Sequence, residues 1–186
     1  GSLMLRTAFL ALLLQALPAL ADEAGDPPVI DGCGIWPHTQ CRGADLRHAK
    51  LAGRNLAGAD FSGARMARAD LRGANLAGAN FDGADLTAAR LNKAAAPTAT
   101  FRGARLVGAD LEFARLFRAD FSQADLSGAN LEAGKLNYAW FRGARLVDTN
   151  LQEAKMFSVN LRDADLSGNV DFADLLTVAQ NYGQNG

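Results

Sequence analysis

The sequence has little cysteine, little histidine and no excess of either charge. Two Cys and two His in 186 residues leave little material for a histidine–cysteine metal site. With 19 Lys and Arg against 20 Asp and Glu, the chain has neither the basic excess expected of a nucleic-acid binder nor the acidic excess expected of a nucleic-acid mimic. Aromatic residues make up 8% of the chain and ten of them are Phe, so a folded domain is expected rather than disorder.

The apolar run of the N-terminal segment is too short to span a membrane. Its apolar run covers residues 8–17, whereas a span needs about 20 residues. An Ala-Leu-Ala sequence at residues 19–21 has the small-x-small pattern that a signal peptidase accepts. We predict a signal peptide at residues 1–21, with residues 1–3 set aside because they precede the first Met. The mature chain would begin at Asp22 and be exported to the periplasm or the exterior; an uncleaved anchor is the alternative.

A five-residue repeat runs without insertion through residues 44–168. Its central position, residue 46 and every fifth residue to 166, is Leu, Phe or Met in 24 of 25 units, and Ala96 is the exception. Ala stands two residues before the centre in 21 units, and Asp or Asn directly before it in 14. A period of five fits neither a helix nor a simple strand, but it fits a solenoid in which each unit makes one side and one corner. The central residue and the small Ala would then point inward.

Two features with a period of twenty indicate four sides per coil. The Phe residues at the central position are all spaced by twenty. A set of charged residues, each directly before another central residue, is also spaced by twenty and alternates in sign. Stacked coils lie about 4.8 Å apart, so alternating charges in register attract where like charges would repel. The repeat array corresponds to about six coils at this spacing. The residues are Phe61, Phe81, Phe101, Phe121 and Phe141, and Asp45, Arg65, Asp85, Arg105, Asp125, Arg145 and Asp165.

The repeat resembles the pentapeptide-repeat family, whose pattern is A(D/N)LxG or close to it. This resemblance implies an all-β fold, a right-handed quadrilateral β-helix. The main departure is Lys93–Ala99, where Ala96 replaces a bulky centre and Pro97 cannot donate a ladder hydrogen bond. We expect a local bulge or a small cavity there. The register of the repeat should be kept, because Phe101 stands at the next expected central position.

The N-terminal end of the solenoid needs a cap, since a bare end exposes apolar centres and strand edges. Residues 22–43 are the predicted N-terminal cap. Counting back by fives places Trp36 at a central position, where it would close the first coil.

The two cysteines of the chain, Cys33 and Cys41, lie in this cap. In an exported chain they favour a disulfide. The alternative is a metal site that combines them with His38 and His48, although the spacing does not match a zinc pattern.

Residues 163–186 begin within the last pentapeptide unit, continue beyond it and have two interpretations. The spacing of Phe172, Leu175, Leu176, Ala179 and Tyr182 predicts a short C-terminal α-helix that caps the last coil. The twelve residues that begin at Asp163 also resemble one half of a type I dockerin, which implies one calcium ion and attachment to a cohesin-like partner or a surface. Ser167 departs from the usual Asp or Asn, and one loop is present instead of two. The implied ligands are Asp163, Asp165, Ser167, Asn169, Asp171 and Asp174.

Five aromatic residues occupy outward positions where the repeat otherwise places small or polar residues. All but the first fall near one corner of the later coils, so they indicate a contact surface for a partner protein or a second copy of the chain. A solenoid end is a second place for self-association, and the C-terminal helix is an alternative cover for the corner. The five are Phe113, Phe117, Tyr138, Trp140 and Phe157.

Nothing in the sequence marks a catalytic site. Both His lie near the N-terminal end, and the positions of the Asp residues follow the repeat. We therefore predict an exported, non-catalytic scaffold that binds protein, with no cofactor except the calcium ion implied above. The calcium-dependent attachment module is the alternative function. A third class, the topoisomerase-protecting DNA mimics within the pentapeptide-repeat family, is disfavoured by the alternating charges and the signal peptide.

Overall fold

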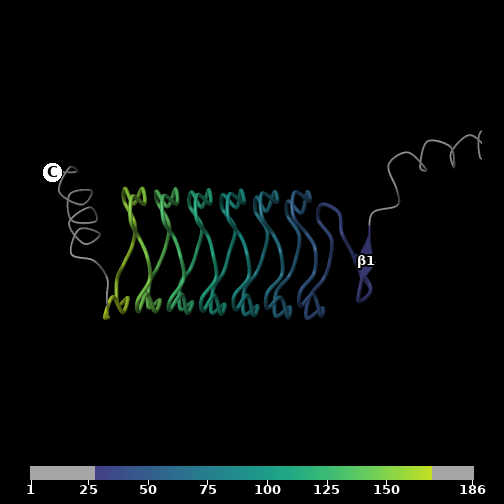
Figure 1. Cartoon of the computed structure of the whole chain (residues 1–186), viewed down its shortest axis with the longest axis horizontal. Helices are drawn as coiled ribbons and strands as arrows, with labels where there is room; N and C mark the ends of the chain where they lie inside the picture. The colour runs from purple at the N-terminus through teal and green to yellow at the C-terminus, as the bar shows by residue number, and fades with distance from the viewer. Residues whose placement is uncertain (1–27, 169–186) are drawn as a thin grey trace, which may run out of the picture.

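The computed structural model describes residues 28–168 (Figure 1). It begins with a hairpin of two antiparallel strands, β1 (Val29–Ile30) and β2 (Cys33–Gly34). Asp31 and Gly32 form the turn, with φ angles of 51° and 71°. Asp-Gly is favoured in a two-residue hairpin turn because both positions need a positive φ. After the hairpin, the chain winds into coils that stack along the long axis of the molecule (Figure 1).

The coils have the predicted twenty-residue register. Parallel bridges join residues twenty positions apart, from Gln40↔Asp60 at one end to Arg145↔Asp165 at the other. Each bridge lies directly before a central residue, so four five-residue units make one coil. This confirms the all-β, four-sided solenoid. The number of coils stays a prediction, and the predicted C-terminal helix lies outside the described residues.

The hydrogen bonds of one unit explain the consensus A(D/N)LxG. In the unit 59–63, the Asp60 N–H bonds to the preceding coil at 2.8 Å, and the N–H groups of Phe61 and Gly63 bond to the following coil at 2.7 and 2.8 Å. The Ala59 N–H closes the turn of the previous unit at 3.1 Å. The remaining N–H, that of Ser62, donates to the Asp60 carboxylate at 2.9 Å. Every backbone donor of the unit is therefore satisfied, and Gly63 supplies the positive φ of the corner.

The core is a column of central side chains on each of the four sides, packed with the small Ala residues. One column consists of five fully buried Phe rings, as predicted. Neighbouring ring centroids are 5.3, 4.9, 4.7 and 5.0 Å apart along the column. The spacing of the rings therefore follows the spacing of the coils.

The expected bulge at Lys93–Ala99 is wrong. Ala95 bridges to the coils on both sides, and the Ala96 N–H donates to the Arg115 carbonyl at 2.8 Å. The reason is the position of Pro97, directly after the central residue. This is the one position of the unit whose N–H donates to no backbone carbonyl, so proline removes no ladder bond. The small cavity beside Ala96 stays a prediction.

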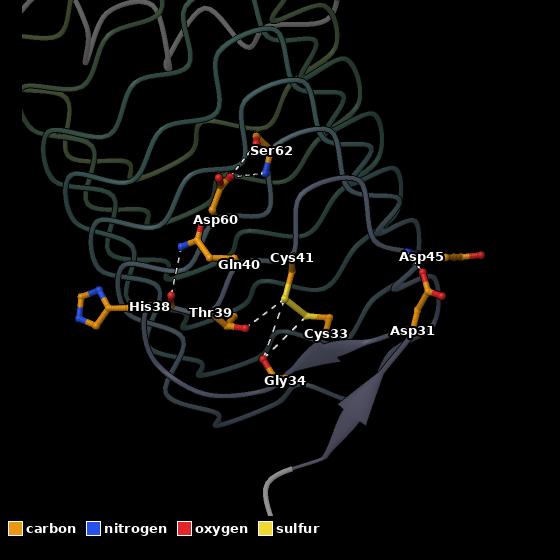
Figure 2. The surroundings of a disulfide bond; sticks show 10 residues. All are labelled: Asp31, Cys33, Gly34, His38, Thr39, Gln40, Cys41, Asp45, Asp60 and Ser62. Carbon is orange, nitrogen blue, oxygen red and sulfur yellow. Dashed lines mark hydrogen bonds between the residues drawn. A yellow bond between two sulfur atoms is a disulfide. The ribbon is translucent and has the colours of Figure 1, made fainter.

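The predicted disulfide between Cys33 and Cys41 is present and ties β2 to the first coil, with the Cα atoms 5.2 Å apart (Figure 2). The alternative metal site is therefore wrong, because both sulfur atoms are already bonded to each other. The Asp31 carboxylate adds a second link by accepting the Asp45 N–H at 2.7 Å. The prediction that Trp36 closes the first coil from an inward position is wrong, because its side chain is 44% exposed. Cys33, in β2, is buried instead. The hairpin interrupts the five-residue register at this point.

Candidate interaction surface

Three rings form an edge-on chain of contacts at the corner that follows the central residues Leu116, Leu136 and Met156. The Tyr138 ring lies 5.4 Å from that of Phe117 and 5.5 Å from that of Phe157, each at 80°. Phe117 and Phe157 occupy the same corner position two coils apart. The Tyr138 ring, from the coil between them, lies between their rings. The same corner position of that coil is Asn137, whose side-chain oxygen accepts the Phe157 N–H at 2.9 Å. The rings are therefore held as one cluster by the coil stack.

Trp140 extends this cluster onto the next side of the solenoid. Its backbone is fixed by bridges to Asp120 and Asn160 in the two neighbouring coils. An open groove of about 580 Å³ lies beside it, lined by Arg118 and Tyr138 together with residues 158–160. We call Phe117, Tyr138, Trp140 and Phe157 the aromatic corner.

Three of the four side chains of the aromatic corner are exposed. Phe117, Tyr138 and Trp140 are 41%, 40% and 50% exposed, and Phe157 is half-buried. Phe113, also exposed, lies apart on the preceding corner, beside a hollow lined by Arg90, Lys93 and Glu112. The structure thus brings four of the five predicted surface residues together and leaves Phe113 separate.

Arg118 belongs to this surface and was not identified from the sequence. Its guanidinium lies 5.3 Å from the centroid of the Phe117 ring and 5.5 Å from that of Tyr138. A cation over aromatic faces is attracted by the ring quadrupoles, so Arg118 places positive charge directly on the apolar patch. The twenty-residue spacing from Arg118 to Tyr138 is the signal that could have found it.

The backbone at Tyr138 is left-handed, as it is at the same position of other units. Tyr138 has a φ of 62° and Phe113, on the preceding corner, a φ of 56°, where the consensus places Gly. Residues with a Cβ hold the same conformation in other units, among them Arg68, Ala88 and Glu153. The repeat therefore sets this conformation, and it does not distinguish the aromatic residues.

Away from the corner, the predicted alternating charges occupy one stacked column. Arg65–Asp45 and Arg145–Asp125 are ion pairs across neighbouring coils, each at 3.8 Å. The pKa of Asp45 falls to about 2, mainly because the Arg47 side chain of its own unit donates to the carboxylate. This face is therefore close to neutral.

The pKa of Asp70 also falls to about 2, for the corresponding reason. The Arg72 guanidinium donates to this carboxylate, with an ion-pair distance of 2.7 Å. The repeat therefore uses the Asp before the centre as a structural acceptor.

The calcium-loop residues lie partly in the last described unit. The Asp165 carboxylate accepts the Ser167 N–H at 3.0 Å, and the Asp165 backbone forms a parallel bridge with that of Arg145, as in other units. Asp163 is at a corner with a φ of 59°. In the part of the chain that is described, no group of three or more His, Cys, Asp or Glu is placed to hold a metal ion. The remaining predicted ligands lie outside the described residues; they are Asn169, Asp171 and Asp174.

Within residues 28–168 there is no helical segment with the length and hydropathy that crossing a bilayer requires.

The comparison with known proteins gives matches to one repeat family. The family model for pentapeptide repeats matches eight copies, over residues 39–76, 64–95, 99–132 and 135–168. A pentapeptide repeat protein from the thylakoid lumen of Arabidopsis thaliana is 26% identical, with a TM-score of 0.55, and the match covers 59% of this chain and 77% of that one. The sequence has no match among the curated proteins.

Two cyanobacterial structures are also similar. Rfr23, a pentapeptide repeat protein from Cyanothece 51142, is 31% identical with a TM-score of 0.37, and the match covers 53% of this chain and 64% of that one. HetL, a pentapeptide repeat protein involved in heterocyst differentiation regulation in Nostoc sp. strain PCC 7120, is 23% identical with a TM-score of 0.32. That match covers 80% of this chain and 92% of HetL.

The family match and the structure agree on the repeat. The matched residues make up more than half of the chain and coincide with the units that bridge at twenty-residue spacing. The family fold is a right-handed quadrilateral β-helix, which gives the four-sided solenoid its hand. The chain belongs to the pentapeptide-repeat family.

Proposed function

We propose that the chain is a non-catalytic scaffold that binds a partner protein through the aromatic corner. The observation that carries this proposal is the edge-on cluster of Phe117, Tyr138 and Phe157, in which the first two rings are exposed. Contiguous exposed aromatic residues are typical of binding surfaces, where rigid rings contribute contact area at a low entropic cost. A coil stack is a rigid support for them, because each corner is bonded to the coil before and after it.

We also propose that the chain is exported. The disulfide between Cys33 and Cys41 supports export, because disulfides persist in oxidising compartments and are rare in the cytosol. Intact-mass analysis of the natural protein tests this: a chain beginning at Asp22, without free thiols, is expected. Retention of residues 4–21 would contradict cleavage of the predicted signal peptide.

The partner-binding proposal is tested by comparative capture from the fraction in which the natural protein is found. The bait is the mature chain, beside a variant with Tyr138→Gly and Trp140→Ser. Val29→Ser is the matched control, because Val29 is an exposed apolar residue at the far end of the molecule. A partner retained by the wild type and the control, and lost by the double variant, supports the proposal.

Equal capture by all three baits would overturn the binding proposal. Sedimentation analysis of the same proteins identifies the case in which the partner is a second copy of the chain. In that case the wild type sediments as a dimer and the double variant as a monomer.

The calcium-dependent attachment module is the second proposal. It rests on the twelve-residue spacing that begins at Asp163, with Gly168 at the sixth position. Calorimetric titration of the mature chain with calcium, beside an Asp171→Ala, Asp174→Ala double variant, tests it. Heat of binding from the wild type alone is expected, and equal heats from both proteins would contradict a calcium loop.

A further inference from the structure

One outward column of the solenoid carries three positive charges in succession. Arg115, Lys135 and Lys155 occupy the position before the central residue in consecutive coils, and the bridges Arg115↔Lys135 and Lys135↔Lys155 put them in register. All three side chains are exposed. Across residues 28–168, none of the three takes part in an ion pair with a carboxylate. We call these three residues the basic column.

The repeat offers a way to avoid this repulsion and uses it elsewhere. In the alternating column, Arg65 and Arg145 each pair with an Asp of a neighbouring coil. Like charges directly opposite each other on neighbouring strands are destabilising, and here they recur at about 4.8 Å. An anionic group laid along the basic column would offset this repulsion.

Aromatic side chains border the basic column on both sides. Within one coil, the outward residues Phe113, Arg115 and Phe117 alternate with the buried residues Ala114 and Leu116. Two coils later, the half-buried Phe157 follows Lys155 in the same way. Arg118, stacked over the rings of the aromatic corner, adds a fourth positive charge.

Carboxylates limit the width of this positive strip. On the corner before the basic column stand three Glu residues, of which Glu132 accepts a hydrogen bond from Asn150 on the preceding side at 3.3 Å. On the side after the aromatic corner, Asp120 is paired with Arg102 at 2.6 Å. The other two Glu residues are Glu112 and Glu153.

A strip flanked by carboxylates suits a narrow anion and repels a wide one. A nucleic-acid duplex would extend over the flanking Glu residues and Asp120, and four cations are few for a phosphate backbone. A single extended peptide advances about 3.3 Å per residue, so the three coils of the basic column correspond to about three or four peptide residues.

We propose that the basic column and the aromatic corner together bind a short, extended acidic segment of the partner protein. In this segment Asp or Glu residues lie along Arg115, Lys135 and Lys155, and a neighbouring bulky apolar residue packs on the aromatic corner. Complementary charge steers the segment to the strip and sets its direction, and the rings hold it there. This inference rests on the proposed function, because it names the chemistry of the partner at the same surface.

The test measures binding of a labelled peptide by fluorescence anisotropy. The peptide is fluorescein-labelled Glu-Glu-Trp-Glu-Glu, and its matched control carries Gln in place of each Glu. The proteins are the mature wild type, Lys135→Glu and Arg142→Glu. Arg142 is the control because it is exposed, has no ion pair within the described residues and lies on a different corner. Both reversals change the net charge by the same amount.

We expect Lys135→Glu to weaken binding of the Glu peptide by about tenfold or more, and Arg142→Glu to change it by about twofold or less. The Gln peptide should bind the wild type weakly, and added salt should weaken binding of the Glu peptide. Lys135→Glu restores alternating charge, so its melting temperature should not fall below that of the wild type. Lys135→Gln provides the same comparison without a new negative charge.

Three results would overturn the inference: no binding of the Glu peptide at low salt, an equal effect of the two reversals, or tighter binding of single-stranded oligothymidylate. One further result would contradict this inference and leave the proposed function standing. If Lys135→Glu still captures a partner that the Tyr138→Gly, Trp140→Ser variant loses, the aromatic corner binds protein and the acidic segment is wrong.

Discussion

The rings of Phe101 and Phe121 stack with their centroids 4.7 Å apart and their planes inclined by only 6°. Isolated aromatic pairs prefer offset or edge-to-face arrangements. The near-parallel stack therefore reflects the repeat of the backbone, whose neighbouring coils are fixed by hydrogen bonds at both ends of every side. A ring removed from this column would leave a space that the coils cannot close.

Phe101→Ala tests the rigidity of the column. The ring is fully buried between two others, so we expect a loss of about 3–5 kcal/mol in the free energy of unfolding. Phe113→Ala removes the same group from an exposed corner and should change stability by about 0.5 kcal/mol or less. Guanidinium unfolding of the three proteins gives the comparison. Equal stability of the two variants would contradict the four-sided register.

Acid should destabilise the repeat between about pH 4 and pH 2. The pKa values of Asp45 and Asp70 are about 2 in the folded chain, below the value of about 3.9 for an unfolded Asp. A lowered pKa contributes stability that is complete above the unfolded value and is lost as the pH falls through the folded value. We expect the melting temperature of the wild type to fall in this window.

The variant with Asp45→Asn and Asp70→Asn is the control for the acid effect. It should melt at a lower temperature than the wild type at neutral pH, and its melting temperature should depend less on pH below 4. An acid profile parallel to that of the wild type would assign the effect to other carboxylates.

Proline should be tolerated at the position directly after a central residue. Ala67 occupies this position, and its N–H makes no hydrogen bond within the described residues. Ala67→Pro should therefore change the free energy of unfolding by about 1 kcal/mol or less. Arg68→Pro should cost about 3 kcal/mol or more, since the Arg68 N–H donates to the Thr87 carbonyl and its φ is 58°. Thermal unfolding of both variants would reveal equal losses if this account of Pro97 were wrong.

Removal of the disulfide should loosen the N-terminal end. Cys33 and Cys41 are separated by eight positions, and closing so short a loop contributes about 2–3 kcal/mol in the chain-entropy account. We expect a Cys33→Ser, Cys41→Ser variant to show faster amide hydrogen exchange in residues 33–45, with residues 101–145 unchanged. Uniform acceleration along the chain would mean that the bond supports the whole stack instead of its end.

The sequence was sufficient for those parts of the fold that repeat with a strict period. The Phe column and the alternating column from Asp45 to Asp165 follow directly from a spacing of twenty, because identical positions stack. Pro97 was misjudged because a sequence does not show which N–H of a unit is unused by the ladder. Trp36 was misplaced because the Asp31–Gly32 turn starts a hairpin with a period of its own.

The candidate surface was predictable only in part. Outward aromatic residues stand out from a repeat of small and polar residues, so Phe117, Tyr138, Trp140 and Phe157 could be found from the pattern. The stacking of Arg118 depends on side-chain direction at a corner, which the spacing alone does not determine. The basic column has the same twenty-residue spacing as the alternating column. Whether its charges are paired depends on the directions of the neighbouring carboxylate side chains, which the spacing does not give.

The uniform spacing of the bridges also determines how the fold is assembled. Each new coil closes a loop of the same twenty residues, so the entropy of closure is nearly constant at every step. Forming the first coil is the expensive step, because no backbone edge yet exists to receive it. The disulfide, a closure of only eight positions, lowers this cost at the N-terminal end. We therefore expect folding to begin at that end and the stack to grow from it one coil at a time toward the C-terminus.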